Sequence, residues 1–219
     1  MQLFVKLIDT MGTDLTVVNA ARVSFGKQKT EFGDGDAFLI RYLAKHNHWS
    51  PFGHCMLQFH IKAPIFVARQ LVKHQVGLVW NEISRRYVDT EPEFYKVDKW
   101  RGKPVDKKQG SSGEFDQQRL CDMAQSRVED TALDAYQQLI QWGVAPEQAR
   151  MVLPQSLMTE WYWSGSLYAF ARVCNLRCAD DAQYETRSIA NEIDTQCKIK
   201  FPVSWKELRT WAEKSMQNT

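Results

Sequence analysis

The amino-acid sequence predicts a single α+β domain over residues 1–219. Three observations favour this class. A chain of this length can bury a sizeable core without needing a second domain. Alternation of apolar and polar residues, clearest at 55–62, indicates strands. Longer stretches with apolar residues three and four positions apart indicate helices.

The composition excludes several classes of protein. Hydrophobic residues make up 44% of the chain and charged residues 25%, as in ordinary globular proteins. The formal charge of +2 is too small to indicate a nucleic-acid or membrane partner. No apolar run approaches the roughly 18–20 residues that a membrane-spanning helix needs, and the first residues lack the pattern of a secretory signal. We therefore expect a cytoplasmic protein.

The chain is predicted to begin with a strand and two helices. The strand covers residues 3–8. Asp14 is expected to cap the first helix, which runs to Arg22. The second helix covers 36–45, and its apolar face is made by Phe38, Leu39, Tyr42 and Leu43.

A second strand and a third helix follow a loop. Alternation places three apolar side chains of the strand 55–62 on one face: Leu57, Phe59 and Ile61. Pro64 suits the first turn of a helix that reaches about His74. Residues 80–88 are expected to be extended.

The second half of the chain is predicted to be mostly helical. Residues 96–113 are rich in glycine, proline and serine, and we expect them to form a mobile surface excursion from the domain. A long helix at 115–142 ends at Gly143, and a short helix lies between Pro146 and Pro154. The remaining helices are predicted at 166–174 and 181–198.

One polar cluster lies on the third predicted helix. Gln70, Lys73 and His74 are three and four positions apart, so they would share a helix face. Taken alone, this pattern is also that of an ordinary solvated face.

A second polar cluster follows a few residues later. Glu82, Ser84 and Arg86 alternate, and in an extended segment they would point to one side. An arginine binds phosphate with two parallel donors, and carboxylate and hydroxyl groups bind ribose or ring N–H groups. An edge strand with exposed charges would show the same pattern, but two such clusters so close together favour a pocket for an anionic ligand.

Three further arginines lie among apolar residues: Arg150, Arg172 and Arg177. Burying a guanidinium is costly unless a carboxylate or phosphate pairs with it. The alternatives are therefore a bound anion or internal salt bridges to Asp180, Asp181 or Glu185.

The motifs of several other enzyme classes are absent. There is no GxGxxG turn, phosphate-binding P-loop, GxSxG elbow or HExxH pair. The five cysteines are scattered without a CxxC pair, and we interpret Cys174 and Cys178 as buried core thiols. His46, His48 and His54 lie close together, but no cysteine or carboxylate joins them at ligand spacing. We expect no metal.

The polar clusters belong to a longer ordered set of motifs. Three segments resemble the signature region of flavin-dependent thymidylate synthases: APIFVARQ at 63–70, KHQ at 73–75 and NEISRRY at 81–87. Four further segments resemble that family in the expected order: AARVS at 20–24, HWSPFGH at 48–54, ARMVLP at 149–154, and NLR at 175–177 followed by AQYE at 182–185. Each motif alone is weak, but the ordered set is specific.

This resemblance implies a fold and an activity. The fold is a central antiparallel sheet flanked by helices, assembled as a homotetramer whose active sites form where subunits meet. The activity is transfer of the methylene group of methylenetetrahydrofolate to C5 of dUMP to give dTMP, with FAD as cofactor and NADPH as reductant. No enzyme cysteine attacks the uracil in this family, which agrees with cysteines that lack activating neighbours.

The resemblance also implies which residues surround dUMP. Arg86 and Arg150 would contact phosphate and sugar, and Ser84 would lie beside the reacting base. Arg177 would act catalytically by holding the uracil in a polarised, N3-deprotonated-like form, because a guanidinium stays charged and is preorganised. The full set is Arg69, Gln70, Lys73, Glu82, Ser84, Arg85, Arg86, Arg150 and Arg177. The FAD contacts would come from His48, Ser50, Lys73, His74, Gln75, Glu82, Ser166 and Arg172.

The chain departs from the family pattern on the flavin and folate side. Lys73-His74-Gln75 stands where the family has Arg-His-Arg, and eight residues rather than seven separate this triplet from Ser84. Ser166 and Arg172 replace usual asparagines, and Asp181 replaces a frequent histidine. Two alternative functions follow. One is a flavin-dependent hydroxymethylase acting on a deoxypyrimidine monophosphate, and the other is a non-catalytic homologue that binds a nucleotide or flavin.

Overall fold

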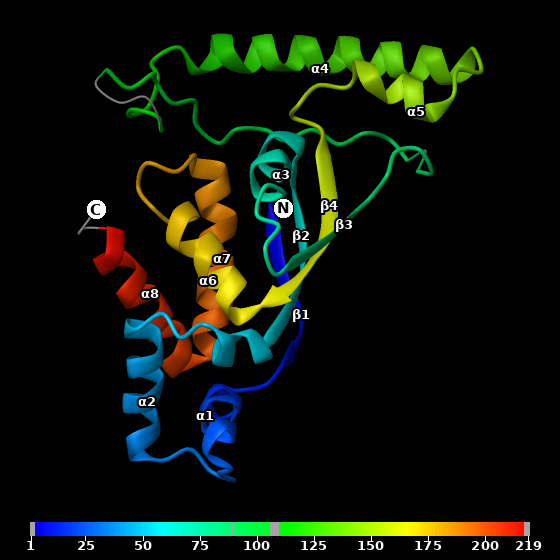
Figure 1. The fold of residues 1–219 in the computed structure, drawn as a ribbon. Coiled ribbons are helices and arrows are strands. Elements are labelled where there is room, and N and C mark those ends of the chain that lie inside the picture. The colour runs from blue at the N-terminus through cyan, green and yellow to red at the C-terminus, as the bar shows by residue number, and fades with distance from the viewer. Residues whose placement is uncertain (1–2, 89, 106–109, 217–219) are drawn as a thin grey trace.

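The computed structural model contains one four-stranded antiparallel sheet. It describes residues 3–88, 90–105 and 110–216. The strands are β1 (Phe4–Met11), β2 (Met56–Pro64), β3 (Leu78–Glu82) and β4 (Met158–Ser166), in the order β1-β2-β4-β3. The predicted fold, an antiparallel sheet flanked by helices, is confirmed (Figure 1).

The helices account for most of the remaining chain. They are α1 (Asp14–Arg22), α2 (Asp34–Lys45), α3 (Ile65–Leu71), α4 (Gln118–Gln141), α5 (Pro146–Ala149), α6 (Leu167–Arg177), α7 (Tyr184–Lys200) and α8 (Pro202–Met216). Short 3-10 turns occur at Val23–Phe25, Ser50–His54 and Arg150–Val152. None of the described helices is long and apolar enough to cross a membrane. In Figure 1, α4 runs across the top of the molecule, and α6, α7 and α8 lie together beside the sheet.

The core lies between the sheet and helices α6 and α7. Leu57, Phe59 and Ile61 are buried on one face of β2, as their alternation predicts. Phe59 pairs with Trp163 of β4 in register, and Phe170 of α6 packs edge-on against both rings at centroid distances of 5.0 and 5.3 Å. The opposite face of the sheet is polar and partly exposed.

Strand β4 was not predicted from the sequence, although it lies at the centre of the sheet. Its residues do alternate: Trp161 and Trp163 are buried, whereas Glu160, Tyr162 and Ser164 point to the other face. On that face His60 of β2 stacks on Tyr162 at 5.1 Å and hydrogen-bonds Glu160 at 2.9 Å. Cross-strand pairs therefore fix the register of β2 and β4 on both faces.

Three sequence predictions about local structure are wrong. The helix after Pro64 ends at Leu71, so Lys73 and His74 lie in the following turn and share no helix face with Gln70. The segment predicted to be extended as far as Val88 leaves the sheet after Glu82, and residues 85–87 form a turn. The predicted apolar face of α2 is wrong at two of its four positions: Phe38 and Tyr42 project to solvent, whereas Leu39 and Leu43 lie against the core together with Ile40.

Asp14 caps a different helix from the one predicted. Thr13 is the N-cap of α1, and its amide donates to the Thr16 hydroxyl at 3.0 Å. The Asp14 carboxylate accepts from the amides of Val203 and Ser204 at 3.0 and 2.8 Å, at the start of α8. A carboxylate here satisfies free helix N–H groups, so Asp14 joins the first and last helices. Helix α8 itself was not predicted.

Residues 96–113 contact the domain where they are described. Gly102 and Gly113 form a backbone hydrogen bond of 2.9 Å, and Arg101 forms an ion pair with the buried Glu185 of α7. The predicted mobility of this segment stays a prediction, and its residues 106–109 lie outside the described part of the chain.

A buried carboxylate connects α1, α2 and the segment between them. Asp36 is fully buried and receives charged hydrogen bonds from Arg22, at 3.0 Å, and from Lys29. Burial alone would raise the pKa of Asp36, but bonds from Lys29, the Gly33 amide and Arg22 outweigh it and lower the pKa to about 2.

Replacing Asp36 should destabilise the fold and remove part of its acid sensitivity. Asp36→Asn leaves two cations without their acceptor, and we expect a loss of about 1.5–3 kcal/mol in the free energy of unfolding. Because the folded pKa lies below the unfolded value of about 3.9, the carboxylate contributes stability above pH 4 that is lost as pH falls towards 2. Urea titrations monitored by tryptophan fluorescence between pH 7 and pH 2 measure both effects.

The exposed neighbour Asp34 provides the control. Asp34→Asn should leave the acid dependence of stability close to that of the wild type. If Asp36→Asn also left it unchanged, the ionic network would not be the source of this stability.

Candidate functional site

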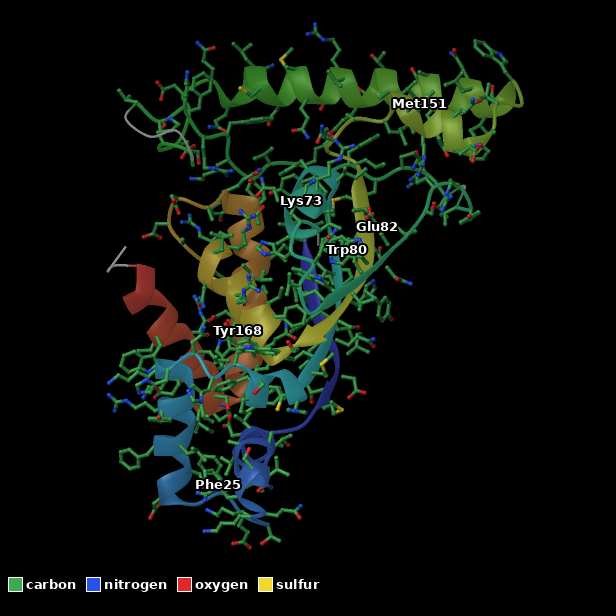
Figure 2. The ribbon with its side chains drawn as sticks, viewed as in Figure 1. Phe25, Lys73, Trp80, Glu82, Met151 and Tyr168 are labelled. Atoms are coloured by element: carbon green, nitrogen blue, oxygen red, sulfur yellow. The ribbon has the colours of Figure 1, made fainter. Side chains whose placement is uncertain are left out.

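The polar residues singled out in the sequence surround three depressions on the protein surface. The large cleft, of about 650 Å³, is bordered by Arg69, Glu82, Arg85, Arg150 and Met151 among others. The small cleft, of about 170 Å³, is bordered by Lys73, His74, Gln75 and Arg172. A third depression, of about 370 Å³, is bordered by Asn47, Tyr168 and Arg172. Figure 2 labels residues at each: Glu82 and Met151, Lys73, and Tyr168.

Strand β3 lies between the large and small clefts, and β4 is its only partner among the described residues. The Trp80 ring stacks on Trp161 at 4.4 Å with an interplanar angle of 17°, and meets Trp163 edge-on at 5.5 Å. Aromatic pairs in these geometries stabilise beyond the area they bury. Trp80 therefore positions a short strand that ends in Glu82.

Two glycines let the loop before β3 pass close to β4. Gly77 has φ +75°, in the left-handed region that favours glycine, and its carbonyl accepts from the Ser166 amide at 3.2 Å. A Cβ at Gly165 would lie 2.5 Å from that same carbonyl oxygen. The segment between the Lys73-His74-Gln75 triplet and Ser84 is one residue longer than in the family pattern. It can pack against the start of α6 because Gly77 and Gly165 have no side chains.

Glu82 is fixed by hydrogen bonds to both carboxylate oxygens. Oε1 accepts from the Thr159 hydroxyl at 2.7 Å, and Oε2 accepts from Trp80 Nε1 at 3.1 Å. An oriented carboxylate at the cleft wall suits recognition of hydroxyl or ring N–H groups.

The arginines of the large cleft differ in how far their guanidinium groups are already hydrogen-bonded within the chain. Arg85 donates to the carbonyls of Thr90 and Glu91 at 2.5 and 3.4 Å, so its guanidinium closes the loop after β3. Arg69 and Arg150 are exposed, and Arg150 Nε donates only to the Glu147 carbonyl at 3.2 Å. Arg69 and Arg150 are therefore better placed than Arg85 to bind an anion.

Ser84 and Arg86 contact each other just beyond β3. Arg86 Nε donates to Ser84 Oγ at 3.0 Å, and the guanidinium lies 4.9 Å from the centre of the Tyr87 ring. The two predicted site residues are thus brought together by a turn rather than by strand alternation.

Arg177 contacts His74, which borders the small cleft. Arg177 Nε donates to His74 Nε2 at 3.0 Å across 103 residues of sequence. Burial, followed by the charges of Arg177 and Arg172, lowers the pKa of His74. A neutral ring that accepts at Nε2 carries its proton on Nδ1. His74 therefore stays uncharged at neutral pH and orients Arg177.

The predicted alternative of internal salt bridges is not what the structure contains. Among the described residues Arg150, Arg172 and Arg177 form no ion pair with a carboxylate. Asp180 pairs with Arg187 instead, and Glu185 pairs with Arg101. The positive charge of Arg177 is thus left without a neutralising partner, as binding of an anionic ligand group requires.

The remaining predicted flavin contacts lie near the third depression and the start of α6. Tyr168 donates to Asn47 at 2.9 Å, beside His48 and Ser50 in the chain. Ser166 is the N-cap of α6 and accepts from the Ala169 amide at 3.2 Å. Arg172 borders both the small cleft and the third depression, so it links them.

Gln70 lies apart from the other predicted dUMP contacts. Its side chain bonds the Thr186 hydroxyl at 3.0 Å and the amide of Gln183, both from the α7 region. None of the described depressions has Gln70 in its lining. Its role as a dUMP contact stays a prediction.

Three buried cysteines are unsuited to act as nucleophiles. Burial and the neighbouring Asp14 raise the pKa of Cys55 to about 12, although a bond to Thr13 opposes the shift. Burial likewise raises the pKa of Cys174 and of Cys197 well above the ordinary value. The thiolate is the nucleophilic form, so these thiols are inert at neutral pH.

The chain resembles known proteins along most of its length. Residues 6–203 match the family model described as "Thymidylate synthase complementing protein". The chain is 44% identical over 203 residues to a flavin-dependent thymidylate synthase of Thermus thermophilus, covering 92% of this chain and 74% of the relative. It therefore belongs to the flavin-dependent thymidylate synthase family.

Other relatives extend this comparison. A flavin-dependent thymidylate synthase of Thermosipho africanus is 40% identical over 96% of this chain and 92% of the relative. Among solved structures, the UMP/dUMP methylase PolB of Streptomyces cacaoi bound with 5-Br dUMP superposes with a TM-score of 0.86. The two chains are 31% identical in sequence, and the superposition covers 96% of each. The same methylase bound with 5-Br UMP gives a TM-score of 0.84.

Introducing a side chain at Gly165 should displace β3. In Gly165→Ala the new methyl group must push the Gly77 carbonyl or the strand away, and we expect a loss of about 1–3 kcal/mol in the free energy of unfolding. The near-ultraviolet circular dichroism of the stacked Trp80 and Trp161 should also weaken.

Gly35 in α2 has open space around its Cβ position and provides the matched control. Gly35→Ala should leave stability unchanged or raise it by up to about 1 kcal/mol. Equal behaviour of the two variants would show that the close approach of β3 and β4 has no structural importance.

Proposed function

We propose that the chain is a thymidylate synthase that transfers the methylene group of methylenetetrahydrofolate to C5 of dUMP, using FAD and NADPH. The observation on which this rests is Arg177, a guanidinium without an ionic partner, held by the neutral His74 beside further cations. The names of the relatives and the brominated nucleotides bound to the similar methylase support the same assignment.

In this proposal the dUMP phosphate is bound by exposed arginines. Arg86 and Arg150 have guanidinium N–H groups available, and Arg69 borders the same cleft as Arg150. Bidentate N–H···O bonds make arginine well suited to a phosphate. Glu82, fixed by Thr159 and Trp80, would then select the sugar or base by accepting from its O–H or N–H groups.

Arg177 is proposed to act on the uracil ring. Attack by C5 on an electrophilic carbon requires electron density to move from the ring nitrogen and carbonyl groups towards C5. A fixed positive charge beside N3 and its carbonyl neighbour favours the form in which that density is raised. His74 orients the guanidinium through its hydrogen bond. Because the His74 ring is neutral, it leaves the positive charge of Arg177 available to the substrate.

The small cleft and the third depression have the chemistry that a dinucleotide cofactor needs. Exposed Lys73 and Arg172 come from separate segments and meet at the small cleft, where they suit a pyrophosphate. His74, Gln75, Ser166, Ser50 and His48 would supply the remaining contacts. Bound FAD supplies the electrons, received from NADPH, that reduce the transferred carbon to a methyl group. Lys73 and Gln75 offer fewer donors than the family's two arginines, so we expect weaker FAD binding than a full triplet gives.

A homotetramer is part of the proposal, because the site is open in a single chain. Arg69, Lys73, Arg86, Arg150 and Arg172 are all exposed, and no described depression contains both Arg150 and Arg177. Active sites exclude water to strengthen charge interactions, so another subunit would have to cover these residues. Native mass spectrometry should give a mass of four chains, and a stable monomer would contradict this arrangement.

Product analysis tests the proposed reaction. The protein is incubated with dUMP, methylenetetrahydrofolate, NADPH and FAD, and the nucleotide is analysed by mass spectrometry. We expect dTMP, with tetrahydrofolate and NADP⁺ formed in equal amounts. A hydroxymethyl nucleotide would replace the proposal by the hydroxymethylase alternative, and no product despite bound flavin and dUMP would favour a non-catalytic homologue.

Arg177→Ala should lower kcat by at least about 100-fold, because removing a single preorganised donor typically costs this much. The variant should retain its oligomeric state. Arg187→Ala is the matched control, since the Arg187 guanidinium contacts Asp180 and the Tyr184 ring and borders none of the described clefts. Full activity of Arg177→Ala would remove the catalytic assignment.

A further inference from the structure

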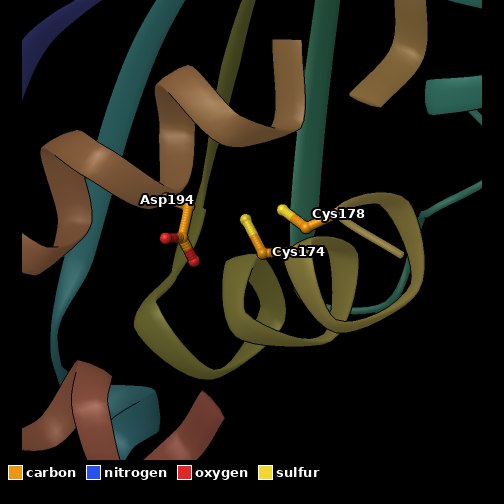
Figure 3. Close-up of side chains that lie close together, drawn as sticks. All are labelled: Cys174, Cys178 and Asp194. Carbon is orange, nitrogen blue, oxygen red and sulfur yellow. The ribbon is translucent and has the colours of Figure 1, made fainter. Parts of the chain in front are cut away.

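Two helices bring three metal-binding side chains together at the end of α6. The ligand atoms of Cys174, Cys178 and Asp194 all lie within 4.8 Å of one another. Cys174 lies on α6 and Cys178, four positions later, is its C-cap, so the two side chains lie on the same side of the helix end. Figure 3 shows their sulfur atoms beside each other, with the Asp194 side chain of α7 next to them.

A further thiol lies on the facing helix but outside this cluster. Cys197 follows Asp194 by three positions on α7 and is fully buried. The three ligand atoms that lie within 4.8 Å of one another are those of Cys174, Cys178 and Asp194.

Two donors from α8 hold one oxygen of the Asp194 carboxylate in place. Oδ1 accepts from Trp205 Nε1 at 3.1 Å and from Arg209 Nε at 2.8 Å. Among the described residues, Oδ2 accepts no hydrogen bond. Metal ligands are usually oriented by outer groups in this way, and here one oxygen remains available.

Charge balance favours a divalent cation here. Without a metal, the carboxylate of Asp194 is neutralised by Arg209 and both thiols are protonated. Binding of one divalent cation to the two thiolates releases two protons and leaves the whole group, Arg209 included, neutral. Neutrality matters because an uncompensated charge is costly to bury.

We propose that Cys174, Cys178 and Asp194 bind one zinc-type divalent cation between α6 and α7. Two sulfurs and one oxygen match the ligands that zinc prefers, and water completes a tetrahedron. Tetrahedral bonds of 2.0–2.3 Å separate ligand atoms by roughly 3.5 Å. The ligand atoms, which lie within 4.8 Å of one another, would have to move closer together to bind the cation.

Cys174 lies in the core and Cys178 packs against it, as predicted. The proposed site adds a role for these thiols, and it does not depend on the proposed function. Its position gives it a structural role. Arg177 directly precedes Cys178, whose amide closes the last turn of α6 by donating to the Cys174 carbonyl at 2.9 Å. A bound cation would join this turn to α7.

Cobalt binding tests the proposal directly. The full-length protein is treated with chelator, kept reduced, and titrated with Co²⁺ while the thiolate-to-cobalt absorption in the near ultraviolet is recorded. We expect one Co²⁺ per chain with tetrahedral visible bands, displacement by Zn²⁺, release of two protons per ion, and a higher melting temperature with Zn²⁺. Absence of thiolate-to-cobalt absorption would overturn the proposal.

Variants distinguish this site from other thiols. Cys178→Ser is the main variant because Cys178 is half-buried and tolerates a hydroxyl better than the fully buried Cys174. Losing an outer-shell partner already costs about 10–100-fold in affinity, so losing a direct ligand should weaken binding by at least about 100-fold. Cys121→Ser on α4 is the matched control and should bind like the wild type. Unchanged binding by a folded Cys178→Ser would overturn the assignment.

Discussion

The attachment of β3 to β4 is the constraint on which the functional surface depends. This five-residue strand has a single partner among the described strands, and its position is set by Trp80 stacked on Trp161 and by the contact of Gly77 with Gly165. The loop before β3 contains His74, and the strand itself ends in Glu82. The turn beyond it contains Ser84 and Arg86. These candidate site residues therefore take their positions from the pairing of β3 with β4.

The consequence is a surface divided into separate parts. At the end of β3, Arg69, Glu82 and Arg150 border the large cleft, which is proposed to bind the phosphate and sugar of the nucleotide. Near the start of β3, His74 borders the small cleft with Lys73 and Arg172 and accepts the hydrogen bond from Arg177. The substitutions in the Lys73-His74-Gln75 triplet weaken the cationic character of this second part. They leave the bond from Arg177 to His74 in place, because it needs only the neutral imidazole.

Local sequence patterns predicted the helices and strands that depend mainly on interactions between residues close in sequence. Alternation located β2, and helix periodicity located α4, α6 and α7 to within a few residues. The end of α3 at Leu71 and the turn after Glu82 were not predictable in this way, because the Gly77–Gly165 contact sets the path of the chain there. The bond from Arg177 to His74, the Asp14 cap on α8 and the Cys174–Asp194 contact join distant segments. Only the family resemblance placed Arg177 and His74 in one site.

In the proposed tetramer, a complete site would combine Arg150 from one subunit with Arg177 from another. Arg150→Ala and Arg177→Ala proteins, each inactive, are mixed under mild denaturant and reassembled. Random exchange between subunits should restore activity to about a quarter of the sites, because only those receive both intact arginines. Native mass spectrometry verifies that mixed oligomers form. If they form and no activity returns, the two arginines do not come from different subunits, and this account of the site is wrong.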